Sequence, residues 1–128
     1  MYFGGIMRIQ ESGEMYLETI FLLLQKKSRV RSVDVCTEMG YSKPSVSRAV
    51  SLLKDGGFIT SDKDGYLSLT ESGLLIAQKT YERHTLLTKW FETIGVSHDT
   101  AEEDACKIEH CISDETFEAL KSFLNKQS

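Results

Sequence analysis

The stretch that decides the fold of this 128-residue chain is "GYSKPSVSRAVSLLKDGGFITSDKDGYLSLT", residues 40–70. Ser42 is a favourable helix N-cap, and Pro44 suits a first helical turn, where no backbone N–H is needed. Apolar residues then recur with the spacing of one helical face, at Val46, Ala49, Val50 and Leu53. Two short alternating segments, "GFIT" and "YLSLT", flank "SDKDG", in which Asp64-Gly65 is typical of a hairpin turn. The stretch therefore predicts a helix followed by a β-hairpin.

Two further helices are predicted before this stretch. Residues 11–27 carry apolar side chains at helical spacing, and Ser32 is a candidate cap for a short helix, "VDVCTEM", that stops at Gly40. Two helices joined by the tight "GYS" turn are typical of a helix-turn-helix, and a hairpin after the second makes a winged helix. We expect residues 1–70 to form a winged-helix DNA-binding domain.

Residues 71–128 are predicted to be entirely helical. A long helix follows Thr70 and runs to about Ile94, a second occupies residues 98–112 after the "GVS" break, and a third follows Ser113. Their apolar faces exceed what three short helices hide from water alone, which predicts a homodimer. The expected fold class is mainly α, an N-terminal winged helix-turn-helix followed by an all-helical dimerisation and metal-binding domain.

Charge is distributed unevenly along the chain. The formal net charge is −4, yet residues 26–54 carry +5 and the remainder −9. Such segregation indicates that one half faces a polyanion. In a dimer, two recognition helices would read a palindromic operator in double-stranded DNA. We expect major-groove contacts from Ser42, Lys43, Pro44, Ser45, Ser47 and Arg48, and phosphate contacts from Lys54 and the wing residue Lys63.

A second concentration of reactive side chains is "ACKIEHC", residues 105–111. On a helix, Cys106, Glu109 and His110 share one face, and Glu102 lies one turn earlier on it. Thiolate, carboxylate and imidazole are ligands for Fe²⁺, Co²⁺, Ni²⁺ or Zn²⁺. Three ligands from one helix rarely complete a coordination sphere, so a second element must contribute. The candidates for these further ligands are His84, Met15 and Glu18.

Each of these residues also has a purely structural interpretation. Met15 is an ordinary core gap filler, and a single histidine such as His84 is usually solvated or part of a cap. The acidic run that begins at Glu102 is a typical solvated helix face. Cys111 falls off the ligand face and Cys36 suits a small core position. Spacing alone leaves both interpretations open.

Longer motifs, in a fixed order, carry a resemblance to a known family. They are "EMYLETIFLL", "SKPSVSRAVSLLKDGGFI", "GYLSLTESG", "ERHTLLTKWFETIGV" and "EEDACKIEHCIS". From residue 11 to about residue 118 the chain resembles the diphtheria-toxin-repressor family of metal-dependent transcription factors, which includes the manganese transport regulators. The resemblance implies a metal ion that bridges the DNA-binding and dimerisation halves and so sets the spacing of the recognition helices.

The resemblance also implies a ligand set. Cys106 and its helix partners match the activating site of the iron-responsive branch, whereas two other positions match the two-metal cluster of the manganese branch. Thr88 stands where an ancillary carboxylate is expected, and Glu102 replaces a histidine of the iron branch. The first set is Met15, Cys106, Glu109 and His110, and the second pair is Glu18 and His84. Fe²⁺ is the expected ion, with Mn²⁺, Co²⁺, Ni²⁺ and Zn²⁺ as alternatives.

Other classes of function are less consistent with the sequence. A metallohydrolase using Glu102 or Glu103 as base would lack a Gly-rich loop and a nucleophile elbow, so we expect no enzyme activity. A sensor of small organic ligands conflicts with the ligand spacing, and a protein-binding adaptor conflicts with the +5 segment. No apolar run approaches the roughly 20 residues that cross a bilayer, and three cysteines do not suit a secreted disulfide framework. We therefore expect a cytoplasmic protein with no membrane partner and no small organic substrate.

Overall fold

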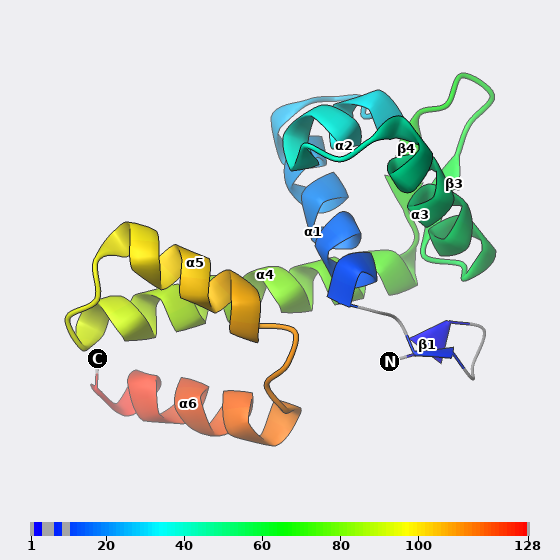
Figure 1. Ribbon diagram of the computed structural model, residues 1–128. Helices are drawn as coiled ribbons and strands as arrows, with labels where there is room; N and C mark the ends of the chain where they lie inside the picture. Colours follow the sequence, from blue (N-terminus) through cyan, green and yellow to red (C-terminus); the bar gives the residue numbers. More distant parts are fainter. Residues whose placement is uncertain (1, 4–6, 9–10, 128) are drawn as a thin grey trace. The chain divides into compact units, whose positions relative to one another are not determined.

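The computed structural model describes residues 2–3, 7–8 and 11–127 (Figure 1). The helices are α1 (Glu11–Lys26), α2 (Ser32–Met39), α3 (Lys43–Asp55), α4 (Glu71–Thr93), α5 (His98–Ile108) and α6 (Asp114–Gln127). The strands are β1 (Tyr2–Phe3), β2 (Met7–Arg8), β3 (Ile59–Ser61) and β4 (Leu67–Leu69). The chain forms two compact units, Met1–Gln78 and Lys79–Ser128, so α4 contributes to both. The prediction of a mainly helical fold is confirmed.

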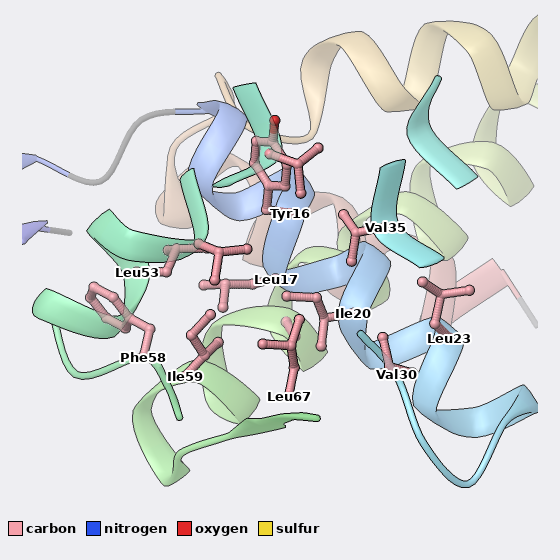
Figure 2. Close-up of a cluster of buried hydrophobic side chains, with 13 residues drawn as sticks. Tyr16, Leu17, Ile20, Leu23, Val30, Val35, Leu53, Phe58, Ile59 and Leu67 are labelled. Atoms are coloured by element: carbon pink, nitrogen blue, oxygen red, sulfur yellow. The ribbon is translucent and has the colours of Figure 1, made fainter. Parts of the chain in front are cut away.

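One apolar core, to which α1, α2, α3 and the β3–β4 hairpin all contribute, holds the N-terminal unit together (Figure 2). The apolar stripe of α3 lies in this core, as its spacing predicts, with Val46, Val50 and Leu53 buried and Ala49 packed against them. The opposite face of α3 is exposed. The buried members from the other elements are Tyr16, Leu17, Ile20, Leu23, Val30, Val35, Phe58, Ile59, Leu67 and Ala77.

Local signals set several helix ends in the way the sequence predicts. The Ser42 hydroxyl accepts the N–H of Ser45 at 3.3 Å and caps α3. Thr70 caps α4 in the same way, accepting the N–H of Gly73 at 3.2 Å. Gly40 ends α2 with φ 71°, a left-handed conformation that glycine adopts without strain.

The start of α2 differs from the prediction that Ser32 caps it. Ser32 is the first helical residue, and Arg31 is the N-cap. The carboxylate of Asp34 accepts the backbone N–H of Arg31 at 2.8 Å and also pairs with Lys27 at 2.7 Å. This acidic side chain in the first turn bonds back to the cap residue and so takes the place of a capping hydroxyl. Its negative charge also interacts favourably with the positive end of the helix dipole.

The wing is a short antiparallel hairpin in which Ile59 pairs with Leu69. In its turn, the Asp62 carboxylate accepts the N–H groups of Asp64 and Tyr66, both at 2.9 Å. Gly65 has φ 84°, so the Asp64-Gly65 signal marks the turn as predicted. A second antiparallel strand pair, β1 with β2, was not predicted from the sequence.

The C-terminal unit consists of the rest of α4 with α5 and α6, around a small core that includes Leu87, Ala105 and Phe117. The prediction that the second helix reaches residue 112 is wrong, because α5 ends at Ile108. The N–H groups of Cys111 and Ile112 both bond to the Ile108 carbonyl, at 2.9 and 3.1 Å, so the chain closes in tight turns there.

Apolar side chains also remain on the surface of the C-terminal unit. Ile94 is 61% exposed and Phe123 is 54% exposed, and Tyr81 and Ile108 are exposed as well. Exposed apolar side chains of this kind favour the predicted homodimer. Among the described residues, no helix has the combined length and apolar character needed to cross a bilayer.

Gly73 tests how the start of α4 fits the hairpin. A Cβ at this position would lie 2.0 Å from the carbonyl oxygen of Phe58, a backbone atom with little freedom to move. We expect Gly73→Ala to lower the free energy of unfolding by about 1–3 kcal/mol in urea denaturation, through overpacking. The exposed neighbour Ser72 gives the control, since Ser72→Ala should change it by no more than about 0.5 kcal/mol. Equal effects of the two variants would contradict this close contact.

Asp34 gives a pH-dependent stability. The hydrogen bond from Lys27 and then that from Arg31 hold the pKa of Asp34 below its usual value. A lowered folded-state pKa gives stabilisation that is complete above the unfolded pKa of about 3.9 and is lost as pH falls through the folded pKa. We expect Asp34→Asn to cost about 0.5–2 kcal/mol in urea unfolding at pH 7.

That difference from wild type should shrink steadily below about pH 4. Lys27→Met should lose only a fraction of it at pH 7, because an exposed ion pair adds little and the bond to Arg31 remains. A cost of Asp34→Asn that stays constant down to pH 3 would refute the linkage.

Candidate metal centre and nucleic-acid interface

The side chain of Glu109 is the most deeply buried charged group of the C-terminal unit, with an exposed fraction of 0%. Nδ1 of His84, on α4, lies 2.9 Å from Oε2 of Glu109. Nε2 of His110, the next residue along the chain, lies 3.2 Å from Oε1. The structure therefore brings together three of the predicted ligands, with one imidazole against each carboxylate oxygen.

These contacts keep Glu109 ionised. Burial by itself raises the pKa of Glu109, but the imidazoles of His110 and His84 more than offset it, so the pKa lies below its usual value. A buried carboxylate without such partners would cost several kcal/mol. Glu109 is thus a charged oxygen donor next to two nitrogen donors.

Glu102 lies at the outer side of this cluster, where it is about half exposed. Its carboxylate is 3.8 Å from Nε2 of His84 and 3.6 Å from Nε2 of His98. His98 is 61% exposed. The cluster thus extends from the buried Glu109 through His84 to a carboxylate at the surface.

The remaining predicted ligands are half-buried. Cys106 lies on α5, one turn before Glu109, whereas Met15 and Glu18 lie on α1 in the N-terminal unit. Cys111 is exposed, and its thiol donates to the Lys107 carbonyl at 3.8 Å.

The side-chain groups of the predicted ligands are chemically suited to a divalent metal ion. Oε1 of Glu109 is buried and lies 3.2 Å from Nε2 of His110 without hydrogen-bond geometry, so a cation could replace this partner. Carboxylate, imidazole and thiolate together suit a borderline transition metal. In the part of the chain that the structure describes, no three His, Cys, Asp or Glu side chains already form a coordination geometry. The imidazoles instead approach separate oxygens of Glu109.

Thr88 does not provide a ligand in the described arrangement. Its side chain is buried, and its hydroxyl donates to the carbonyl of His84 at 2.7 Å within α4. The position at which the family resemblance implies an ancillary carboxylate therefore holds a hydroxyl that is already bound to the helix backbone.

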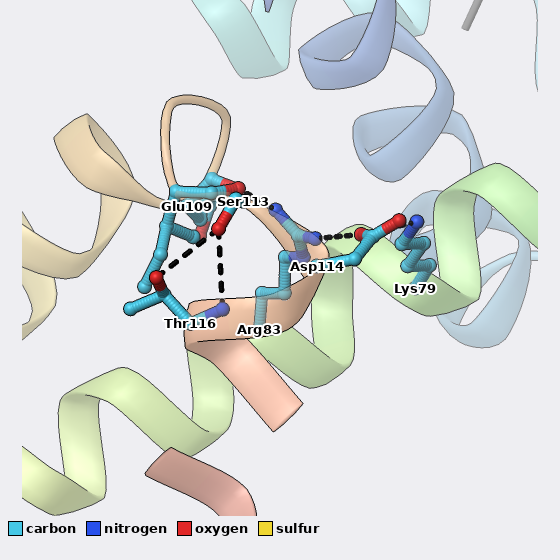
Figure 3. Close-up of polar contacts among 7 residues, drawn as sticks. Lys79, Arg83, Glu109, Ser113, Asp114 and Thr116 are labelled. Atoms are coloured by element: carbon cyan, nitrogen blue, oxygen red, sulfur yellow. Dashed lines mark hydrogen bonds and ion pairs between the residues drawn. The ribbon is translucent and has the colours of Figure 1, made fainter. Parts of the chain in front are cut away.

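Arg83 is a residue of this region that the sequence analysis missed (Figure 3). Its guanidinium is almost fully buried and donates to the backbone carbonyls of Glu109 at 3.1 Å and Ile112 at 2.6 Å. It also pairs with the Asp114 carboxylate and lies 5.2 Å from the ring centre of Phe117. No local sequence signal separates it from exposed basic residues, because its partners are about 30 residues away.

The predicted nucleic-acid interface is exposed throughout. All eight residues lie on the surface of α3, its cap and the wing, namely Ser42, Lys43, Pro44, Ser45, Ser47, Arg48, Lys54 and Lys63. The hydroxyls of Ser42 and Ser45 bond to each other at 2.9 Å. Ser47 and Arg48 have no such local hydrogen bond among the contacts described.

Two arginines outside the predicted set of DNA contacts lie against Tyr66, in the wing between β3 and β4. The guanidinium of Arg31 is 4.5 Å and that of Arg29 is 5.1 Å from the ring centre of Tyr66. Arg31 also donates to the Tyr66 hydroxyl at 3.2 Å. Both side chains are exposed and extend the positively charged surface next to the wing.

Comparison with known families covers almost the whole chain. Residues 8–67 match the N-terminal DNA-binding domain of iron-dependent repressors. Residues 70–128 match the iron-dependent repressor metal-binding and dimerisation domain. The chain belongs to this family.

Individual regulatory proteins are also similar to the chain over most of its length. An uncharacterized HTH-type transcriptional regulator of Methanocaldococcus jannaschii is 31% identical over 92% of this chain and 96% of its own length. The transcriptional regulator MntR of Escherichia coli O157:H7 is 32% identical, over 87% of this chain and 72% of its own. The solved manganese regulator SloR has a TM-score of 0.78 and 29% identity over 88% of this chain, which spans only 53% of that structure.

These findings confirm the resemblance to the diphtheria-toxin-repressor family and its manganese regulators. They also confirm the order of an N-terminal DNA-binding domain and a C-terminal dimerisation domain. The individual ligand and DNA-contact residues, and the boundary between residues 70 and 71, stay predictions.

Proposed function

We propose that this protein is a transcriptional repressor that binds a palindromic operator in double-stranded DNA when it holds a divalent transition metal ion. Fe²⁺ is the ion that we expect. The observation that carries this proposal is the buried, ionised Glu109 between the imidazoles of His84 and His110. The family model that matches this region is that of a metal-binding domain, which supports the same interpretation.

The proposed ligands are those predicted from the sequence. Glu109 and His110 would hold the ion together with Cys106, whose thiolate adds a soft donor, and Met15 would add a thioether. Glu18, His84 and Glu102 would serve the same ion or a second one. A bound divalent cation would supply positive charge that offsets the acidic side chains, and it would replace protons on Cys106 and the imidazoles.

The proposed ligands come from both units, and this gives a mechanism. Met15 and Glu18 belong to the DNA-binding half, whereas Cys106, Glu109 and His110 belong to the dimerisation half. Ligands shared in this way would restrain the two halves and hence the recognition helices of a dimer, which must lie about 34 Å apart to reach successive major grooves. A coupling free energy of about 1–3 kcal/mol would change DNA affinity by about 5–150-fold.

A manganese-responsive repressor is the second candidate. MntR and SloR, to which the chain is similar, are named as transcriptional and manganese regulators. Glu18 and His84 are also the positions that the resemblance assigns to the manganese branch. The thioether of Met15 and the thiolate of Cys106 favour Fe²⁺, because Mn²⁺ prefers harder oxygen donors. An anaerobic titration with each ion, followed by a gel shift on operator DNA, distinguishes the two.

The two cysteines of the ligand segment provide the sharpest test of the metal site. Cys106→Ala should abolish metal-activated DNA binding and keep the fold, because it removes a charged ligand. Even residues that only hydrogen-bond to a ligand typically contribute about 10–100-fold to metal affinity. Cys111→Ala should titrate like wild type, because its thiol is exposed. The measurements are anaerobic Fe²⁺ or Co²⁺ titration and gel shift.

The opposite result would identify a different ligand face. If Cys111→Ala loses the metal response and Cys106→Ala keeps it, the proposed ligand set is wrong. If both respond like wild type, no thiolate takes part, and the soft-donor argument for Fe²⁺ fails with it.

The DNA-binding surface has its own pair of variants. Arg48→Ala should relax base preference at one operator position by about 1–3 kcal/mol, because arginine reads base edges in the major groove. Lys63→Ala should weaken operator and random DNA alike and lower the salt dependence, because a phosphate contact carries no sequence information. Fluorescence anisotropy on both DNAs measures this. Equal losses on both for Arg48→Ala would reject base reading.

A further inference from the structure

We infer that Arg83 is a positioning residue for the metal site, and that it holds the backbone of the ligand segment in place before any ion binds. This inference rests on the proposed function. Arg83 precedes the proposed ligand His84 on α4, and both residues act on Glu109. Arg83 binds its backbone carbonyl, whereas His84 binds its side-chain carboxylate.

The end of α5 explains why such a residue is needed. The last carbonyls of a helix have no partner within it, and a buried carbonyl without a partner is costly. Arg83 donates to the carbonyls of Glu109 and Ile112, which lie just beyond the last helical residue, Ile108. The segment from Glu109 to Ile112 is therefore tied to α4 through its backbone.

The surroundings of the guanidinium fix its own orientation. It lies over the ring of Phe117, whose side chain is buried, and it pairs with Asp114 in the first turn of α6. Lys79 and then Arg83 hold the pKa of Asp114 below its usual value, so this partner is charged. A planar guanidinium presents several donors in a fixed plane, which a lysine ammonium group does not.

The division of contacts has a consequence for metal binding. An ion bound to Glu109 would compete with His84 and His110 for the carboxylate oxygens, but not with Arg83, which uses the carbonyl. The Arg83 contacts can persist in both states. They would keep Glu109 and His110 near their final places, which lowers the ordering cost of binding.

Arg83→Lys tests this role against a matched control in the full-length protein. Lys79, one turn earlier on α4, also pairs with Asp114, at 2.8 Å, and Lys79→Ala removes that pair alone. We expect Arg83→Lys to weaken Co²⁺ binding by about 10–100-fold, as outer supports of metal ligands typically do. Lys79→Ala should bind Co²⁺ like wild type. The measurement is an anaerobic titration with Co²⁺, in which the thiolate charge-transfer band and the visible bands of the bound ion report binding.

At saturating Co²⁺ the bands of Arg83→Lys should match those of wild type, because Arg83 is not itself a ligand. Wild-type Co²⁺ affinity in a folded Arg83→Lys variant would overturn this inference alone. Absence of Co²⁺ binding by the wild type would overturn the proposed function as well.

A second measurement uses the wild type and does not depend on how the variant folds. The amides of Cys111 and Ile112, which bond to the Ile108 carbonyl, should exchange slowly with deuterium in the metal-free protein, and added Co²⁺ should slow them little further. Arg83→Lys, where folded, should exchange these amides faster than Lys79→Ala. Rapid exchange in the metal-free wild type that stops on adding Co²⁺ would show that the ion, and not Arg83, orders this segment.

Discussion

The buried carboxylate of Glu109 is the constraint on which the C-terminal unit depends. An ionised group removed from water requires compensating charge and hydrogen bonds. Two consecutive residues of α4 contribute to this, since His84 meets the carboxylate and Arg83 meets the backbone of the same residue. His110 meets the other oxygen. The early end of α5 belongs to the same arrangement, because continuing the helix would give the Glu109 carbonyl an internal partner and leave Arg83 without it.

The N-terminal unit depends on a different kind of interaction. Its helices and hairpin enclose an apolar core, and short-range caps fix where each element begins. The bond from the Leu67 N–H to the Val30 carbonyl, at 2.7 Å, ties the wing to the segment before α2. The core holds α3 by one face and leaves the opposite face, with Arg48, exposed. Among the described residues, the polar face of α3 takes no part in this core.

The parts of the structure that the sequence predicts are those governed by neighbours along the chain. The cap at Ser42, the left-handed Gly40 and the stripe on α3 each depend on residues within one or two turns. The end of α5 at Ile108 was missed because the Glu109 carbonyl just beyond it bonds to Arg83, which is 26 residues away. The cap of α2 was misassigned because Asp34 acts backwards from inside the helix. For the site, helical spacing grouped Cys106, Glu109 and His110 and left His84 as a candidate from a second element. The contact of His84 with Glu109 joins residues 25 positions apart, so no local pattern indicates it.

The contacts around Glu109 also bear on how such a site would select an ion. In the described arrangement its two oxygens face imidazole nitrogens, so an ion must replace existing partners and not merely fill a space. The apparent affinity is then the intrinsic affinity of the donors reduced by the free energy of those contacts and of the displaced protons. Intrinsic affinity rises from Mn²⁺ through Fe²⁺ to Co²⁺ and Ni²⁺ for any such donor set. Competing internal contacts lower all of these affinities together, and they leave the choice among ions to the soft donors and to the free concentration of each ion. Under the proposed function, Met15 and Cys106 are the residues at which that choice would be made, because they are the only sulfur donors in the proposed set.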